Sequence, residues 1–267
     1  MRRWRARYFL HRGRWTEGIE ALGEVVENAP RPLALKARYL STDALGRSGD
    51  KEGRSAGFEA LAKEDPTGVV GRTAEATILA YDWDYNRSNE ILRSVLADEP
   101  DYHPAQLRLA LGLSFRSGGA EARQVLEQAL RAHPGDYRVH ATFGYAWMHE
   151  DPSASRAAFT RGMQLTSPWV DLGTLKWRGI VAMRSGDIEA AKLDFDGVLE
   201  GQPDQADVRV WRGLAFWQQG QRKSAADDWR KAYALSPEKF SRRLGDMPPK
   251  LRETMWRIAS QDPEEAR

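Results

Sequence analysis

Histidines and carboxylates are the side chains of this 267-residue sequence that could take part in acid–base or metal chemistry. The five histidines stand at positions 11, 103, 133, 140 and 149. None belongs to a His-Glu-x-x-His motif for zinc, and no glycine-rich loop precedes Lys-Ser or Lys-Thr to cradle a phosphate. The chain has no cysteine, which excludes disulfides and thiolate metal sites. The sequence therefore predicts a protein with no catalytic activity, no metal and no cofactor.

His103 and His133 stand next to Pro104 and Pro134. A histidine beside a turn proline is ordinarily a surface turn residue. We therefore expect these two side chains to lie at exposed turns.

A basic, aromatic stretch occupies the N-terminus. Residues 1–15 contain six arginines and no acid, although the formal charge of the whole chain is only +2. In helical projection Trp4, Tyr8, His11 and Trp15 form one stripe. The ordinary explanation is a first helix that packs its aromatic side chains on the next helix and leaves a solvated basic face. The alternative is a docking site for an acidic protein, an anionic membrane surface or nucleic acid.

Prolines recur along the chain at a nearly constant interval. They stand at positions 30, 66, 100, 134, 168, 203 and 237, which are 34 to 36 residues apart. Self-similarity at about 34 residues is typical of an array of helix-turn-helix units. We therefore expect such a chain to act through the binding surface that its helix pairs display.

Other residues follow the same period. Each predicted second helix carries a triplet at i, i+4 and i+7 on one face, such as Ala225, Trp229 and Ala232. Each predicted first helix carries a small residue 24 positions before the proline: Ala6, Thr42, Ala76, Ala110, Gly144, Gly179 and Gly213. Small residues at these positions let the two helices of a unit approach closely.

These features resemble the tetratricopeptide repeat (TPR) over roughly residues 1 to 237. Arg209 and Arg212 depart from the family pattern, which has Trp and Leu in the first helix. The resemblance implies an all-α, right-handed superhelical solenoid of about seven helix-turn-helix repeats, forming one domain because contacts join only neighbouring repeats. The expected repeats are 1–30, 31–66, 67–100, 101–134, 135–168, 169–203 and 204–237. A C-terminal capping helix at 238–261 and a frayed tail at 262–267 are expected to follow.

Most of the turns within units contain a glycine, which suits a helix end with positive φ. The third unit instead reads Asp82-Trp83-Asp84-Tyr85. We expect this turn to pack an aromatic side chain rather than to close tightly. A ligand-binding role for the motif is the alternative.

In proteins similar to this one, the first helices line the concave face and contact the ligand. Carried over repeat by repeat, the resemblance assigns these ligand-binding residues: Arg3, Arg7, Tyr39, Tyr81, Phe115, Arg138, Tyr145, Met148, Lys176, Arg184 and Trp217. Aromatic residues, Met and Arg are the types enriched at interface anchors. The alternative is that several of them only fill the space between neighbouring first helices.

The resulting prediction is a non-catalytic scaffold that binds a peptide or helix of a partner protein, possibly an acidic one. Self-assembly through an uncapped first repeat is one alternative, and binding of nucleic acid or an anionic surface through the arginine-rich first helix is another. No apolar run approaches 18 residues, and arginines interrupt any secretory signal. The predicted location is cytoplasmic, or periplasmic or exported if a leader has been removed.

Overall fold

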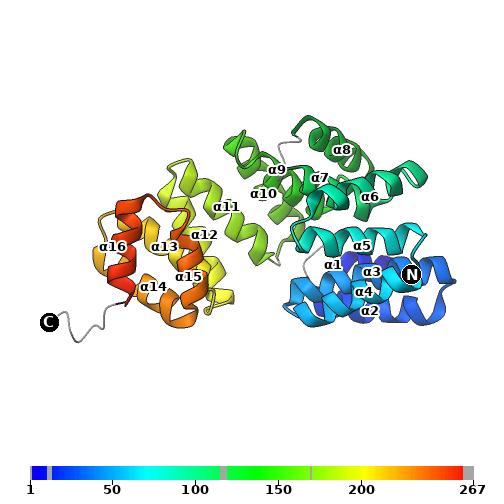
Figure 1. The fold of residues 1–267 in the computed structure, drawn as a ribbon, viewed down its shortest axis with the longest axis horizontal. Coiled ribbons are helices and arrows are strands. Elements are labelled where there is room, and N and C mark those ends of the chain that lie inside the picture. Colours follow the sequence, from blue (N-terminus) through cyan, green and yellow to red (C-terminus); the bar gives the residue numbers. More distant parts are fainter. Residues whose placement is uncertain (1, 11–13, 115–118, 169, 261–267) are drawn as a thin grey trace. The chain divides into compact units, whose positions relative to one another are not determined.

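A computed structural model describes residues 2–10, 14–114, 119–168 and 170–260, and this part of the chain is built from sixteen α-helices (Figure 1). The prediction of an all-α array of helix pairs is confirmed. No helix in the described ranges is long and apolar enough to cross a membrane. The helices are α1 (Arg2–Leu10), α2 (Trp15–Asn28), α3 (Arg31–Ser48), α4 (Lys51–Glu64), α5 (Val69–Tyr81), α6 (Tyr85–Asp98), α7 (His103–Ser114), α8 (Gly119–Ala132), α9 (Tyr137–Trp147), α10 (Pro152–Thr166), α11 (Leu172–Arg184), α12 (Ile188–Gly201), α13 (Ala206–Gln218), α14 (Arg222–Leu235), α15 (Pro237–Leu244) and α16 (Pro249–Ser260).

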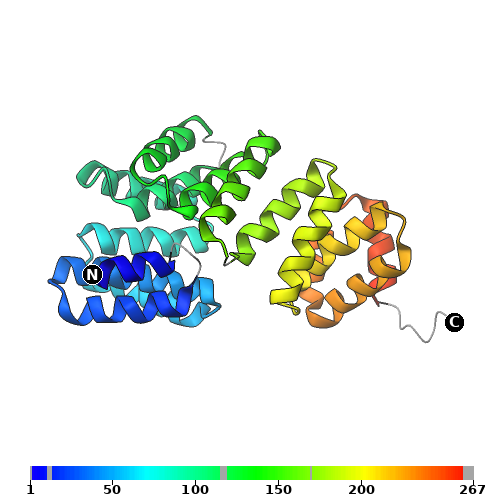
Figure 2. The same cartoon turned by 180° about the vertical axis from the view of Figure 1, so that it is seen from behind.

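Two compact units divide these helices, where the sequence predicts one continuous domain. The first unit, Met1–Asp171, holds five helix pairs from α1/α2 to α9/α10. The second unit, Leu172–Arg267, holds the pairs α11/α12 and α13/α14 together with α15 and α16. Figure 2 shows both units from behind, with α1 alongside α2 in the first unit. We call the first helix of each pair its A helix and the second its B helix.

Small residues of the A helices face large residues of the B helices. A Cβ atom added at Gly213 would lie 2.5 Å from the indole nitrogen of Trp229, which is fully buried. At Gly144 the added atom would lie 2.6 Å from the ring of Phe159. Such distances leave no room for a side chain, and this confirms that the small residues let the helices of a pair approach closely.

Short-range signals set the helix ends. The side chains of Asp50, Asp84, Asp151 and Asp187 cap B helices by accepting a hydrogen bond from a backbone N–H in the first turn. After three of the A helices, Gly49, Gly186 and Gly220 adopt positive φ, as the sequence predicts.

The third turn differs from its prediction. Trp83 has the ring of Tyr85 beside it at 6.1 Å, but 76% of its surface is exposed, so its indole is not packed into the fold. Its φ is +66°, so the turn closes through a left-handed residue like the glycine turns.

Two helices, not one, lie between Pro237 and Ser260. The short helix α15 comes before the predicted capping helix. It begins here because Ser236 accepts a hydrogen bond from the N–H of Lys239 and because Pro237 suits a first turn. Phe240 and Leu244 of α15 are buried, as is Met255 of α16. The predicted tail at 262–267 lies outside the described residues.

Candidate binding site

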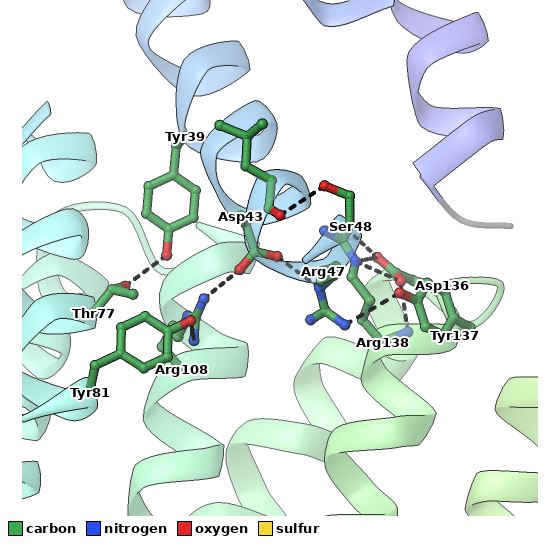
Figure 3. A network of polar contacts seen from close by, with 11 residues as sticks. Tyr39, Asp43, Arg47, Ser48, Thr77, Tyr81, Arg108, Asp136, Tyr137 and Arg138 are labelled. Carbon is green, nitrogen blue, oxygen red and sulfur yellow. Dashed lines mark hydrogen bonds and ion pairs between the residues drawn. The ribbon is translucent and has the colours of Figure 1, made fainter. Parts of the chain in front are cut away.

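A network of polar side chains joins A helices of the first unit (Figure 3). Asp43 on α3 accepts a hydrogen bond from Arg47 at 3.1 Å and another from Arg108 on α7. Arg47 also donates to the hydroxyl of Tyr137 on α9 at 3.5 Å. The Asp43 carboxylate therefore connects α3 with α7, which lies two repeats further along the chain. Arg47 connects α3 with a third A helix, α9.

The electrostatics of Asp43 follow from this geometry. Burial alone would raise the pKa of Asp43, but Arg47, Arg108 and Arg138 together lower it to about 2. Asp43 is therefore ionised at neutral pH. Its negative charge balances the positive charges of the arginines, which would otherwise repel one another.

A second carboxylate organises the start of α9. Asp136 is 1% exposed; it accepts a hydrogen bond from the N–H of Arg138 at 3.0 Å and from the guanidinium of the same residue. The Nε2 atom of His103 lies 2.9 Å from the Asp136 carboxylate, and the rings of His103 and His133 lie 4.2 Å apart. The expectation of an exposed turn histidine is thus wrong for His103. Its side chain is only 13% exposed because it contacts the buried carboxylate of Asp136.

A pocket of about 460 Å³ opens beside this network, and we call it the A-helix pocket. Its apolar walls come from the A helices α1 and α3, from the B helix α2 and from the residues that lead into α7. They include Leu10, Leu22, Val25, Leu33, Leu40 and Tyr102. Its polar lining consists of Lys36, Asp101, His103, His133 and Arg138.

A smaller cleft of about 50 Å³ shares Leu40, Pro104 and Arg138 with the A-helix pocket. Asp43 and Arg108 are among its other lining residues. The polar network therefore lies next to the pocket.

The predicted ligand-binding residues of the first unit have different surroundings. Tyr39 is buried and bonds Thr77 through its hydroxyl at 2.9 Å, and Met148 is also buried. Tyr145 is half-buried, with its ring edge-on to that of Phe159.

Tyr81 and Arg138 also lie at the network. Tyr81 is 42% exposed, and the guanidinium of Arg54 lies 4.1 Å from the centre of its ring. Arg108 donates to the Tyr81 hydroxyl at 3.4 Å, so Tyr81 and Tyr39 both flank the network (Figure 3). Arg138 lines the pocket itself.

Three other predictions fall outside what the structure describes. Arg3 and Arg7 belong to α1, but their side chains are not among the described ones. Phe115 lies in the undescribed range 115–118.

In the second unit, two of the three predicted residues have contacts within that unit. Lys176 donates to Asp207 at 3.1 Å. Trp217 lies against the ring of Trp229, with the guanidinium of Arg222 3.5 Å from its ring centre. Arg184 is exposed at the end of α11.

Sequence reasoning missed the groups that shape the site most. Leu33 and Leu40 of the pocket, and Asp43 and Arg108 of the network, were not among the predicted ligand-binding residues. Asp43 and Arg108 are 65 positions apart, so no short-range spacing signals their contact. Among the described residues no group of three or more His, Asp or Glu side chains is arranged to hold a metal ion.

An all-α array of close-packed sequential helix pairs is the architecture of TPR-like repeat proteins. Comparison with known families agrees, since a tetratricopeptide-repeat model matches residues 178–239. Residues 178–239 thus carry tetratricopeptide repeats, and the described chain has the fold of tetratricopeptide-repeat structures. No curated protein matches it.

Solved structures with the same fold share little sequence with the chain. A tetratricopeptide repeat protein from Parabacteroides merdae is 14% identical over 96% of both chains, with a TM-score of 0.58. A chain of the APC/C hetero-tetramer Cut9–Hcn1 is 17% identical with a TM-score of 0.72; the match covers 98% of this chain but 53% of that one. PilF of Pseudomonas aeruginosa is 16% identical over 81% of this chain and 99% of its own, with a TM-score of 0.56. These likenesses concern the fold.

Proposed function

We propose that the chain is a non-catalytic interaction module whose A-helix pocket holds an apolar segment of a partner protein. The observation that carries this proposal is the pocket itself, whose volume of about 460 Å³ lies within the usual range for binding sites. TPR proteins commonly mediate protein–protein interactions, and the similarity to a chain of the Cut9–Hcn1 assembly is consistent with such a role.

Apolar burial supplies the binding free energy in this proposal. Leu33 and Leu40 are half-buried on α3, so each keeps apolar surface in the pocket wall that a ligand can cover. Removing apolar surface from water is favourable by about 25 cal/mol per Å². A partner segment with two bulky apolar side chains therefore suits this pocket.

The cations of the pocket act as walls in this proposal. Lys36 donates to Glu99 at 2.8 Å, and Arg138 is bound to Asp136. Because these charges are already neutralised within the protein, they offer little to a carboxylate of the partner. Apolar side chains, and not the acidic groups of the original expectation, are the proposed determinants of recognition.

The pocket is tested by replacing Leu33 and Leu40 together by Gln in the full chain. Peptides are first selected from a displayed random library on the wild-type protein, and their affinities are then measured by calorimetry. We expect the enriched peptides to contain bulky apolar residues and to bind the double variant at least tenfold more weakly, because a polar wall removes about 1.4 kcal/mol or more of apolar contact.

A matched control is Leu193→Gln in the second unit, where the leucine is 71% exposed and far from the pocket in sequence. This variant should bind the selected peptides as the wild type does. Far-ultraviolet circular dichroism checks that all three proteins are equally helical. Equal affinity of the folded double variant and the wild type would overturn the proposal.

A further inference from the structure

Trp83 occupies a backbone position that belongs to glycine elsewhere in the chain. It stands 34 residues after Gly49, and both close the turn between an A helix and a B helix. The φ of Gly49 is +106°, and that of Trp83 is +66°. Gly186 and Gly220 adopt the same left-handed conformation in the second unit. A bulky side chain in this region is a steric outlier that glycine would avoid.

The surroundings of Trp83 do not explain this choice by packing. The residue is 76% exposed, which makes it the most exposed large hydrophobic residue of the described chain. Because the indole is exposed to water, Trp83 stabilises the fold no more than a glycine at this position would, although its backbone is strained. Residues held in this way are expected where they contact something outside the chain.

A second aromatic ring lies beside the indole, and acidic residues flank Trp83 in the sequence. The ring of Tyr85 lies 6.1 Å from that of Trp83 at an interplanar angle of 88°. Asp82 and Asp84 flank Trp83 in sequence; Asp82 is exposed, whereas Asp84 caps α6 and forms an ion pair with Arg87 at 3.7 Å. Among the described residues no ion pair reaches Asp82. Two perpendicular aromatic rings beside negative charge form a surface that attracts a cation.

The chain itself pairs aromatic rings with cations at several places. Guanidinium groups lie 4.1 Å from the ring centre of Tyr81, 5.0 Å from that of Trp147 and 3.5 Å from that of Trp217. No lysine or arginine of the described residues lies over Trp83 in this way. The exposed indole is therefore open to a cation from another molecule.

We propose that Trp83, Tyr85 and Asp82 form a docking site for an arginine side chain in a basic segment of a partner protein. The planar guanidinium stacks on the exposed indole, and the Asp82 carboxylate attracts its charge. Arginine fits better than lysine because its guanidinium is planar and more weakly hydrated. This site is separate from the A-helix pocket and does not depend on it.

The test follows indole N–H signals in ¹H–¹⁵N spectra of the full chain during titration with a tetra-arginine peptide that is acetylated and amidated at its ends. The Trp83 signal is identified by its loss in Trp83→Gly. We expect this signal to shift in a saturable way with the arginine peptide and to stay in place with a tetraglutamate peptide blocked in the same way. Asp82→Asn should weaken binding at least threefold, and added salt should weaken it further.

Trp256 provides a matched internal control. It is 44% exposed and lies edge-on to Tyr233, with ring centres 5.6 Å apart, but Arg257 follows it in sequence instead of an acid. Its signal should move little. A Trp83 signal that ignores the arginine peptide, or that moves no more than the Trp256 signal, would overturn the proposal. An unchanged affinity in Asp82→Asn would overturn the role of that carboxylate.

Stability provides an independent readout of the strain. Trp83→Gly should keep or raise the melting temperature, because relief of the left-handed strain offsets the larger chain entropy of glycine. A lower melting temperature would show that the indole stabilises the fold and would contradict a role confined to docking.

Discussion

Replacing Asp228 by alanine is expected to lower the free energy of unfolding of the second unit by about 3–5 kcal/mol. Asp228 on α14 is 3% exposed and accepts two hydrogen bonds of 2.7 Å from Arg212 on α13. Arg209 lies 3.3 Å from the same carboxylate. Without the carboxylate, Arg209 loses its ion pair and Arg212 keeps, among the described residues, only the half-exposed Asp196 at 2.8 Å, although both arginines remain partly buried. Thermal and denaturant unfolding followed by circular dichroism measure the loss.

Asp227 provides the control for this prediction. It neighbours Asp228 on α14, but 67% of its side chain is exposed and its only ion pair among the described residues is to Arg230 at 3.7 Å. Asp227→Ala should change stability by less than about 1 kcal/mol. If the two variants were equally stable, the claim that Arg212 depends on Asp228 would be wrong.

Acidification is expected to remove about 2 kcal/mol of stability from the first unit through Asp43 alone. The folded-state pKa of Asp43 is lowered from 3.8 to about 2, and each unit of such a difference corresponds to about 1.4 kcal/mol. Because the folded pKa is the lower one, the contribution is complete above about pH 4 and is lost as the pH falls through about 2. The physical cause is the attraction of Arg47, Arg108 and Arg138 for the ionised carboxylate.

The measurement compares wild type with Asp43→Asn in denaturant unfolding between about pH 2 and about pH 6. The stability gap between them should be widest above about pH 4 and should narrow toward about pH 2. Glu127→Gln on α8 is the control, since Glu127 is exposed and its removal should leave the pH dependence of the wild type unchanged. A gap for Asp43→Asn that stays constant across this range would contradict the account of the network.

The fold was predictable because the residues that define each helix pair lie within one repeat of the sequence. Proline spacing and paired small and large residues act within about 34 residues, as the close contact of Gly213 with Trp229 shows. Arg212 departs from the family pattern, and the structure supplies the reason: it bonds Asp228 sixteen residues later. Arg178 bonds Asp194 in the same way one repeat earlier, so this pairing is itself a repeated feature.

The site was less predictable because its contacts join residues that are far apart in the sequence. Lys36 reaches Glu99 and Arg108 reaches Asp43, at separations of more than sixty residues. The repeat period identifies the A helices but does not say which of their side chains satisfy one another and which remain available. Tyr39 illustrates this limit, since it lies on an A helix as predicted but is buried against Phe58 and Thr77.

The central claim, that the A-helix pocket receives an apolar partner segment, is tested most directly by methyl spectra of the full chain with a library-selected peptide. The account predicts that leucine methyl signals of Leu10, Leu33 and Leu40 shift in proportion to bound peptide, while that of Leu193 does not move. Binding of the peptide with the three pocket signals unmoved would contradict the claim.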